Sequence, residues 1–304
     1  MSVHPETAAG HRRCGFVATV GAPNVGKSTL VNRLVGAKVS IVSPKAQTTR
    51  MRVLGIVVRG QSQIVLIDTP GLFEPKFRLD TSMVDAAWRT MADADSVMLM
   101  VDSIKGIDQA SRDVMNWLTR HSRPSIAVLN KIDAVDKPKL LQQASELGQA
   151  GVFEHIFMIS ALRGDGVDDV LLHLTRAAPE GPWMFADDDI SDLPPQVLAA
   201  EVTREKLYFQ LQQELPYASA VRTESWRELA DGGVRIEQVI YVERPSHRAI
   251  LIGHRGQRIK QIGEAARKEL GQLLERKVHL FLHVKVREKW RDSQESAQWH
   301  RLEE

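Results

Sequence analysis

The sequence predicts two domains, an α/β domain with a mostly parallel sheet followed by an α+β domain. Apolar runs alternate with amphipathic stretches over residues 13–179, which is typical of strands covered by helices on both faces. A segment rich in proline and aspartate follows, and beyond it the pattern predicts a helix, two strands, two helices and a strand. A chain of 304 residues is long enough for two such units.

The expected strands of the first domain are short and almost continuously apolar. Arg59-Gly60-Gln61 separates two of them by too few residues for a crossover helix, so we expect an antiparallel hairpin there. The other connections have room for helices, as parallel pairing requires. The expected strands are 15–20, 51–58, 62–69, 96–102, 125–129 and 155–160, and a helix is expected over 27–35.

Composition shifts define the expected boundaries. We expect a flexible N-terminal tail over 1–12, a first domain over 13–181, a linker over 182–197, a second domain over 198–290 and a C-terminal tail over 291–304 without an apolar pattern. Within the linker, residues 187–189 are aspartates, which favour a solvated acidic patch over a metal site. The acidic segment 184–190 is alternatively a contact with the first domain.

Composition also excludes several classes of protein. Cys14 is the only cysteine, so the chain can form neither an internal disulfide nor a cysteine metal cluster. No apolar run reaches the roughly 18–20 residues of a membrane span, and the start lacks the apolar core of a secretory signal. We therefore expect a cytoplasmic protein, with peripheral membrane contact left open. Residues 250–291 hold eleven lysines and arginines and four acidic residues, a net charge of +7 that suits a polyanion.

The first expected strand ends in GAPNVGKST, which matches the phosphate-binding pattern G-x-x-x-x-G-K-[ST]. Glycines let the backbone curl around phosphates, and main-chain amides at a helix start face the anion. Lys27 supplies charge for the β- and γ-phosphates, and the Ser28 hydroxyl is a magnesium ligand. The candidate nucleotide-binding residues here are Gly21, Ala22, Pro23, Asn24, Val25, Gly26, Lys27, Ser28 and Thr29.

A second cluster follows the strand at 62–69. A carboxylate at the end of a strand can hold magnesium through water, which is the role expected of Asp68, and the Gly71 amide can reach the γ-phosphate. A plain turn explains Pro70 and Gly71 but not the aspartate. The candidate residues are Asp68, Thr69, Pro70, Gly71 and Leu72.

Two further motifs indicate guanine as the base. The Asp133 carboxylate can accept hydrogen bonds from N1–H and the 2-amino group of guanine, which adenine cannot offer, so we expect ATP to be rejected. The Ala161 amide can reach guanine O6. The candidate residues are Asn130, Lys131, Asp133, Ser160, Ala161 and Leu162.

The polar stretch SPKAQTTR, residues 43–50, can order around magnesium and the γ-phosphate when a threonine hydroxyl reaches the metal. Thr49 is the expected ligand and Thr48 the alternative; a plain polar loop remains open. Lys27, Thr49 and Gly71 are therefore the expected catalytic contacts, and the metal set is Ser28, Thr49 and Asp68.

Together GAPNVGKS, QTTR, DTPG, NKID and SAL resemble the translation-factor-related small GTPases, and the KAQTTR form resembles the bacterial Era-type GTPases. The resemblance implies a P-loop GTPase domain binding GTP or GDP with Mg²⁺. Ras-like GTPases orient water with a glutamine where this chain has Leu72, so slow hydrolysis is expected. Related hydrophobic-substituted GTPases use potassium, which makes Asn24 a candidate K⁺ ligand; the alternative is that it only shapes the loop.

In the second domain, Gly253-His254-Arg255-Gly256 between two helical patterns is the GXXG loop of KH domains, which clamps single-stranded nucleic acid. With the predicted element order, it resembles the type II KH domain of the Era family. The resemblance implies binding to the 3′ end of 16S ribosomal RNA during 30S subunit assembly, without DNA, by a monomer. The candidate RNA-binding residues are Ile252, Gly253, His254, Arg255, Gly256, Gln257, Arg258, Ile259 and Lys260.

Four alternatives remain open. Instead of binding RNA, Ile252 and Ile259 could be core residues, and His254 and Arg255 could form a solvated turn. The whole chain is alternatively a signalling or membrane-associated GTPase whose KH-like domain is a protein-interaction module. A tRNA-modifying GTPase shares the first domain's motifs, but the chain has no cysteine-bearing C-terminal motif of that kind.

Overall fold

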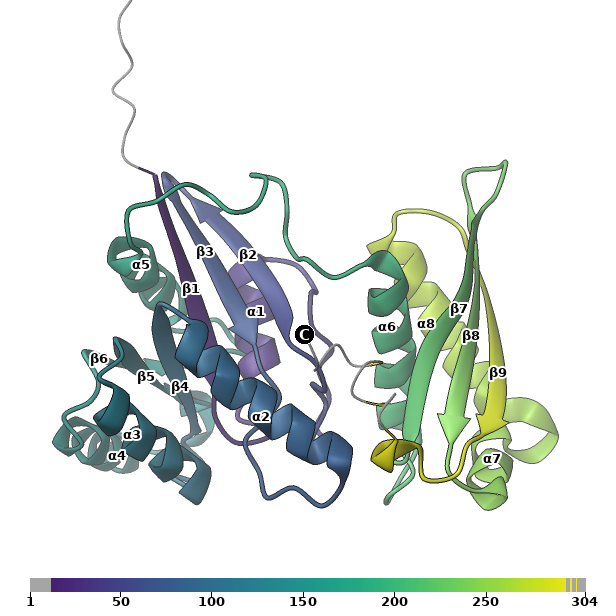
Figure 1. Ribbon diagram of the computed structural model, residues 1–304, viewed down its shortest axis with the longest axis horizontal. Coiled ribbons are helices and arrows are strands. Elements are labelled where there is room, and N and C mark those ends of the chain that lie inside the picture. Colours follow the sequence, from purple (N-terminus) through teal and green to yellow (C-terminus); the bar gives the residue numbers. More distant parts are fainter. Residues whose placement is uncertain (1–11, 294–295, 297–298, 300–304) are drawn as a thin grey trace, which may run out of the picture.

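The computed structural model describes residues 12–293 together with 296 and 299, and it contains the two predicted domains (Figure 1). The first domain has a six-stranded sheet in the order β2-β3-β1-β4-β5-β6, parallel except for β2, which is antiparallel to β3. The predicted α/β class and the hairpin are confirmed. The strands are β1 (Arg13–Val20), β2 (Val53–Arg59), β3 (Ser62–Asp68), β4 (Ser96–Asp102), β5 (Ser125–Asn130) and β6 (His155–Ile159).

Helices cover both faces of this sheet, which explains why its central strands are apolar on both sides. On one face, α1 and α5 bury Leu30 and Val170 against the sheet, and on the other α2, α3 and α4 bury Ala87, Val114 and Leu147. The helices are α1 (Lys27–Val35), α2 (Arg78–Asp93), α3 (Gln109–His121), α4 (Lys137–Gln149) and α5 (Val167–Ala177).

The second domain has a three-stranded sheet in the order β7-β8-β9, with β7 and β8 antiparallel and β8 and β9 parallel. Helices α6 and α8 pack on one face of it, where Leu207, Ile240 and Ile262 share a core (Figure 1). The order α-β-β-α-α-β is the one predicted. The elements are α6 (Pro195–Gln210), β7 (Ser219–Glu228), β8 (Val234–Val242), α7 (Pro245–Ile252), α8 (Gln257–Leu273) and β9 (Val278–Val286).

The expected linker is largely attached to the first domain. Gln63 on β3 accepts hydrogen bonds from the main-chain amides of Met184 and Phe185 at 2.9 and 3.1 Å, and the Ile56 amide on β2 donates to the Ile190 carbonyl at 2.9 Å. The alternative that this acidic segment contacts the first domain agrees with the structure, and residues 187–189 are exposed. The following helix begins at Pro195, within the segment expected to be linker.

The end of the second domain and part of the expected C-terminal tail are packed. Trp290, the last residue of the expected second domain, is fully buried with Leu79 and Met83 of α2, and Trp299, in the expected tail, stacks on Tyr241 with ring centroids 5.0 Å apart. A single tryptophan carries no periodicity, which is why the pattern did not indicate packing in the tail. Residues 294, 295, 297, 298 and 300–304 of that tail, and residues 1–11 of the expected N-terminal tail, lie outside the described residues. Among the helices that the structure describes, none is long and apolar enough to cross a membrane.

Candidate functional site

The carboxyl ends of the parallel strands meet at one edge of the first sheet, where α/β proteins bind ligands. The loop after β1 needs glycine at two positions: a Cβ on Gly21 would lie 2.4 Å from the Met100 carbonyl oxygen, and one on Gly26, whose φ is +102°, would lie 2.3 Å from Asn130 Nδ2. Lys27 Nζ donates to the carbonyls of Gly21 and Ala22, each at 3.0 Å, and burial lowers the pKa of Lys27 to about 8. The lysine therefore crosses the loop at the place where phosphates would lie.

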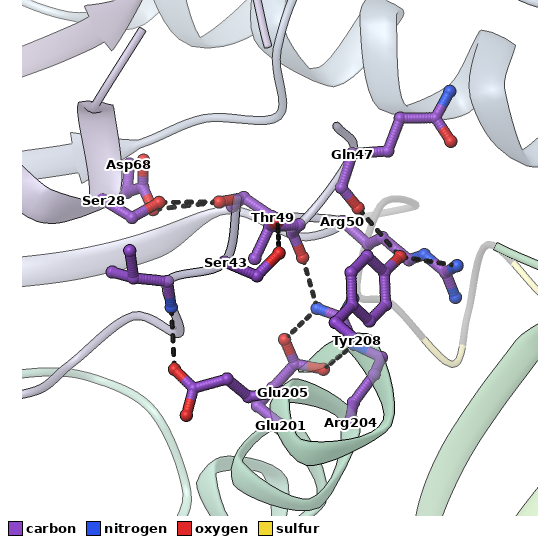
Figure 2. A network of polar contacts seen from close by, with 12 residues as sticks. Ser28, Ser43, Gln47, Thr49, Arg50, Asp68, Glu201, Arg204, Glu205 and Tyr208 are labelled. Carbon is purple, nitrogen blue, oxygen red and sulfur yellow. Dashed lines mark hydrogen bonds and ion pairs between the residues drawn. The ribbon is translucent and has the colours of Figure 1, made fainter. Parts of the chain in front are cut away.

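Three side-chain oxygens converge beside this loop (Figure 2). Ser28 Oγ donates to Asp68 Oδ2 at 2.7 Å and lies 2.8 Å from Thr49 Oγ1, which itself lies 3.3 Å from Asp68 Oδ2. Burial raises the pKa of Asp68, and its Oδ1 is buried with no hydrogen-bond partner among the described residues. Hydroxyl and carboxylate oxygens at a phosphate site fit Mg²⁺, and the unpartnered Oδ1 fits a metal-bound water.

Thr48 is differently placed. Its Oγ1 donates to the Lys45 carbonyl at 2.7 Å and lies 2.6 Å from Ser43 Oγ, so it is used within its own loop. Of the two candidate threonines, the structure thus brings Thr49 and not Thr48 to Ser28 and Asp68. Thr49 as the metal ligand is the assignment that the geometry favours.

The expected guanine motifs form a second group, fixed by local contacts. Asn130 donates through Nδ2 to the Val25 carbonyl at 2.7 Å and accepts through Oδ1 from the Ala161 amide at 2.9 Å. Lys131 Nζ donates to the main-chain oxygen of Asn24 at 2.9 Å and pairs with Asp102 at 2.6 Å. The phosphate loop and the two base motifs are therefore tied to one another by direct hydrogen bonds.

A hydrogen bond from Ser160 is the main cause that lowers the pKa of Asp133, and it favours the carboxylate form needed to accept two hydrogen bonds. Arg163 Nε lies 3.5 Å from the same carboxylate. Leu162 and Ile104 are 73% and 48% exposed and line a cavity beside Asp133. Their side chains give this part of the cavity an apolar surface.

One cavity of about 610 Å³ collects most of the expected residues. Its lining also includes Ile41, Val42, Ile104 and Phe209, which the sequence analysis missed because none of them lies in a motif. Phe209 comes from α6 of the second domain. The expected residues in the lining are Pro23, Asn24, Gly26, Lys27, Ser28, Thr29, Thr49, Gly71, Asn130, Lys131, Asp133, Ser160, Ala161 and Leu162, whereas Gly21, Ala22, Val25, Asp68, Thr69, Pro70 and Leu72 are not in it.

Leu72, at the position of the water-orienting glutamine in Ras-like GTPases, is 4% exposed and packs in the core between the sheet and α2. Its amide donates to the Gly21 carbonyl at 3.1 Å, and a Cβ on Gly71 would lie 2.8 Å from the Pro23 nitrogen, so this turn lies directly against the phosphate loop. Asn24 has a φ of +65° and donates through Nδ2 to the Pro44 carbonyl at 3.0 Å. Its side-chain nitrogen therefore joins the phosphate loop to the 43–50 stretch.

The 38–50 segment, which carries Thr49, is held by α6 of the second domain (Figure 2). Arg204 Nη2 donates to the Thr48 carbonyl at 2.6 Å, and Tyr208 OH donates to the Gln47 carbonyl at 3.2 Å. The Val42 amide donates to Glu205 Oε1 at 2.9 Å. This side of the nucleotide cavity therefore depends on contacts from the other domain.

The candidate RNA-binding residues run from the last residue of α7 through the short loop 253–256 into the first turn of α8. Gly253, Arg255 and Gly256 have φ values of +73°, +49° and +76°, so the loop bends sharply in the left-handed region. His254, Arg255, Gln257 and Lys260 are exposed, whereas Arg258 Nη1 donates to the Ile250 carbonyl at 2.8 Å. Ile259 packs against the core of the domain and Ile252 is half-buried, so the core reading fits Ile259 better.

Comparisons with known proteins agree with both halves. Residues 16–131 match the family described as a 50S ribosome-binding GTPase, and residues 214–291 match the KH domain family. The chain is 53% identical to the GTPase Era of Brucella suis over 94% of this chain and 92% of that protein, and 55% identical to that of Rhizobium meliloti over 95% and 93%.

Among solved structures, Era in complex with MgGDPNP and nucleotides 1506–1542 of 16S ribosomal RNA is 39% identical with a TM-score of 0.91, covering 96% of this chain and 99% of that one. A variant of Aquifex aeolicus Era bound to GDP.AlF4- has the same identity and TM-score and covers 95% and 99%.

Proposed function

Because this chain belongs to the Era GTPase family, we propose that it binds GTP with Mg²⁺ in the cavity of the first domain and hydrolyses it slowly. The observation that carries this proposal is the convergence of Ser28, Thr49 and Asp68 beside the phosphate loop. Ser28 and Thr49 would bind the metal directly and Asp68 through water, and bound Mg²⁺ would neutralise charge on the β- and γ-phosphates. Lys27 and the Gly71 amide would contact the same phosphates.

Hydrolysis needs a group that orients the attacking water or stabilises the charge of the transition state, and the Leu72 side chain can do neither. We propose that a potassium ion at Asn24 supplies the missing positive charge, since the asparagine oxygen is left over after its nitrogen bonds Pro44. Phosphate release from GTP is measured in KCl and in NaCl at equal ionic strength. Faster turnover in KCl is expected, and the gain should disappear in Asn24→Ala; equal rates in the two salts would remove potassium from the proposal.

We further propose that the second domain binds the single-stranded 3′ end of 16S ribosomal RNA and that the protein acts in 30S subunit assembly. The Era structure with RNA supports this proposal, as do the net positive segment 250–291 and the exposed His254 and Arg255 of the GXXG loop. The loop's left-handed backbone lets a strand of nucleic acid approach closely.

Gly256 offers a matched pair of variants, because a Cβ there meets no atom within 4 Å. Gly256→Asp adds a negative charge, and Gly256→Asn adds the same shape without charge; both residues tolerate a positive φ better than others. RNA binding by filter assay should fall about tenfold or more in the aspartate variant and much less in the asparagine variant. Equal affinities in both variants and the parent would contradict a phosphate-contacting loop.

In this function GTP binding and RNA binding are coupled, with hydrolysis resetting the state. RNA affinity is compared with GDP and with a non-hydrolysable GTP analogue in the full chain. A difference of at least several-fold is expected, in the range of ordinary allosteric coupling. Identical affinities would leave a GTPase and an RNA-binding domain on one chain, without a switch.

A further inference from the structure

Arg50 follows the candidate metal ligand Thr49, yet its side chain lies inside the second domain. It is 2% exposed, with Nη1 donating to the Ser219 carbonyl at 2.8 Å and Nη2 to the Tyr217 carbonyl at 2.9 Å. Nη2 also donates to Tyr208 OH at 3.1 Å, and the guanidinium lies 5.7 Å from the centre of the Trp290 ring. A buried arginine with these partners is fixed in position, because moving it would leave a charge and several carbonyls without hydrogen bonds.

The residues just before Thr49 are held from the same side. The carbonyls of Gln47 and Thr48 accept from Tyr208 and Arg204, and Arg204 is itself oriented by a buried ion pair with Glu201. The Thr49 side chain points the other way, to Ser28 and Asp68 (Figure 2). The main chain around the metal ligand is therefore fixed by the second domain, and only the hydroxyl faces the nucleotide.

We propose that Arg50 is a positioning residue for the metal site: by anchoring the 47–50 backbone in the second domain, it holds the Thr49 hydroxyl where Mg²⁺ and the γ-phosphate are bound. This inference rests on the proposed function. It assigns the coupling between the domains to the contacts of Arg50 with the second domain. Loss of these contacts would release Thr49 and leave Ser28 and Asp68 in place.

A second contact extends the same coupling toward the RNA loop. Lys38 Nζ pairs with Glu205 of α6 at 2.7 Å and also with Glu269 of α8, the helix that begins directly after Gly256. The 38–50 segment is thus attached at the Lys38 end to both α6 and α8, and at the Arg50 end to α6 and to the carbonyls of Tyr217 and Ser219. By reciprocity, RNA that shifts these helices changes GTP affinity by the same factor as GTP changes RNA affinity.

The test uses the full-length chain and fluorescent nucleotides, a non-hydrolysable GTP analogue and GDP, each with Mg²⁺ and with EDTA. Threonine ligation in GTPase switches depends on the γ-phosphate and its metal. Arg50→Lys keeps the charge but loses the planar fork that reaches several carbonyls. It should weaken binding of the analogue with Mg²⁺ about tenfold, and change GDP binding and binding in EDTA less than about twofold.

Arg59→Lys is the matched control, since Arg59 is exposed at the end of β2 and lies outside the cavity. Tyr208→Phe removes one hydroxyl from the same network and should give a smaller loss of the preference for the GTP analogue over GDP. If Arg50→Lys is not folded, as judged by the lack of a cooperative unfolding transition, Tyr208→Phe serves as the test. Unchanged analogue affinity, or an equal loss for analogue and GDP, overturns the inference. Failure of the parent protein to bind the analogue with Mg²⁺ overturns the proposed function instead.

Discussion

The two sides of the nucleotide cavity are built in different ways. The base side is held within the first domain, where Asn130 links the phosphate loop to Ala161 and Lys131 bonds Asn24. The metal side carries Thr49 on a segment whose carbonyls are bonded by Arg204 and Tyr208 of the second domain. The base side is therefore held by contacts within one domain, whereas the position of Thr49 on the metal side depends on contacts with the second domain.

This difference in construction indicates which property of nucleotide binding each side of the cavity can control. A site fixed by its own domain sets nucleotide identity, whatever the other domain does. A site completed from outside responds to domain position, because a ligand shifts an equilibrium only through contacts that differ between the two states. Under the proposed function, we therefore expect selection of guanine and sensing of the γ-phosphate to be separable by mutation.

The largest effect is expected on the base side. Asp133→Asn replaces an acceptor of two hydrogen bonds by an amide, and each bond to a charged group contributes about 1.5–3 kcal/mol. GTP and GDP affinities should fall together, by about a thousandfold, as measured by fluorescent-nucleotide titration. Asp165→Asn, exposed after the SAL motif, is the control. A loss confined to GTP would contradict the separation of the two sides.

Leu72 belongs to the locally fixed part, so it should not behave as a replaceable catalytic position. Leu72→Gln places an amide in an apolar core and is expected to lower the free energy of unfolding by about 2 kcal/mol, measured with urea. Turnover of GTP should not rise, because the side chain points into the core rather than toward the cavity. A faster GTPase in this variant would show that the turn after Asp68 is mobile.

Thr49→Ala and Thr48→Ala compare adjacent hydroxyls with different contacts. Removing the Thr49 hydroxyl should weaken Mg²⁺-dependent binding of a GTP analogue about tenfold and leave GDP nearly unchanged. Thr48→Ala loses only bonds within its own loop and should have little effect on either nucleotide. The reverse order of effects would return the assignment to Thr48.

The smallest effect concerns the ion pairs between domains. Burial raises the pKa of Glu269, but hydrogen bonds from Lys206 and Lys38 outweigh it, so the pKa lies below its ordinary value. A lowered folded-state pKa stabilises above the unfolded value of about 4.3, and this stabilisation is lost as the pH falls through the folded value. The stability difference between parent and Glu269→Gln, at most about 1 kcal/mol, should shrink on acidification below pH 4.

The control for that measurement is Glu264→Gln on the same helix, whose exposed carboxylate lies 4.0 Å from Lys260. Urea unfolding at several pH values serves both variants. A difference for Glu269→Gln that stays constant across the acid range would show that its contacts do not depend on ionisation.

Much of this architecture could be predicted from sequence because its signals are local. Apolar runs predicted the strands, and the short Arg59-Gly60-Gln61 connection predicted the antiparallel pair of the first sheet. The phosphate-loop pattern and Asp68 follow strands directly, so their meeting at one sheet edge required no long-range information. The same holds for the GXXG loop, whose glycines take the left-handed backbone that the pattern requires.

What could not be predicted depends on pairs of residues far apart in the chain. Arg50 reads as part of a polar loop, and nothing near it shows that its partners are Tyr208 and Tyr217. The burial of Trp290 against α2 has the same origin. The contact of segment 184–190 with the first domain was one of two alternatives, but its partners on β2 and β3 could not be named from sequence. The roles of individual site residues in binding and catalysis stay predictions.

The separation in sequence between Thr48 and Arg204, 156 residues, also has a consequence for the making of the protein. At a synthesis rate of about 5–20 residues per second, α6 is completed roughly 8–30 s after the loop that it holds. During that interval a nascent first domain can complete its base side once Ala161 is made, because Asn130 accepts from the Ala161 amide, but its metal side has no anchor. We expect the newly made chain to become able to distinguish GTP from GDP only as its own last third is translated.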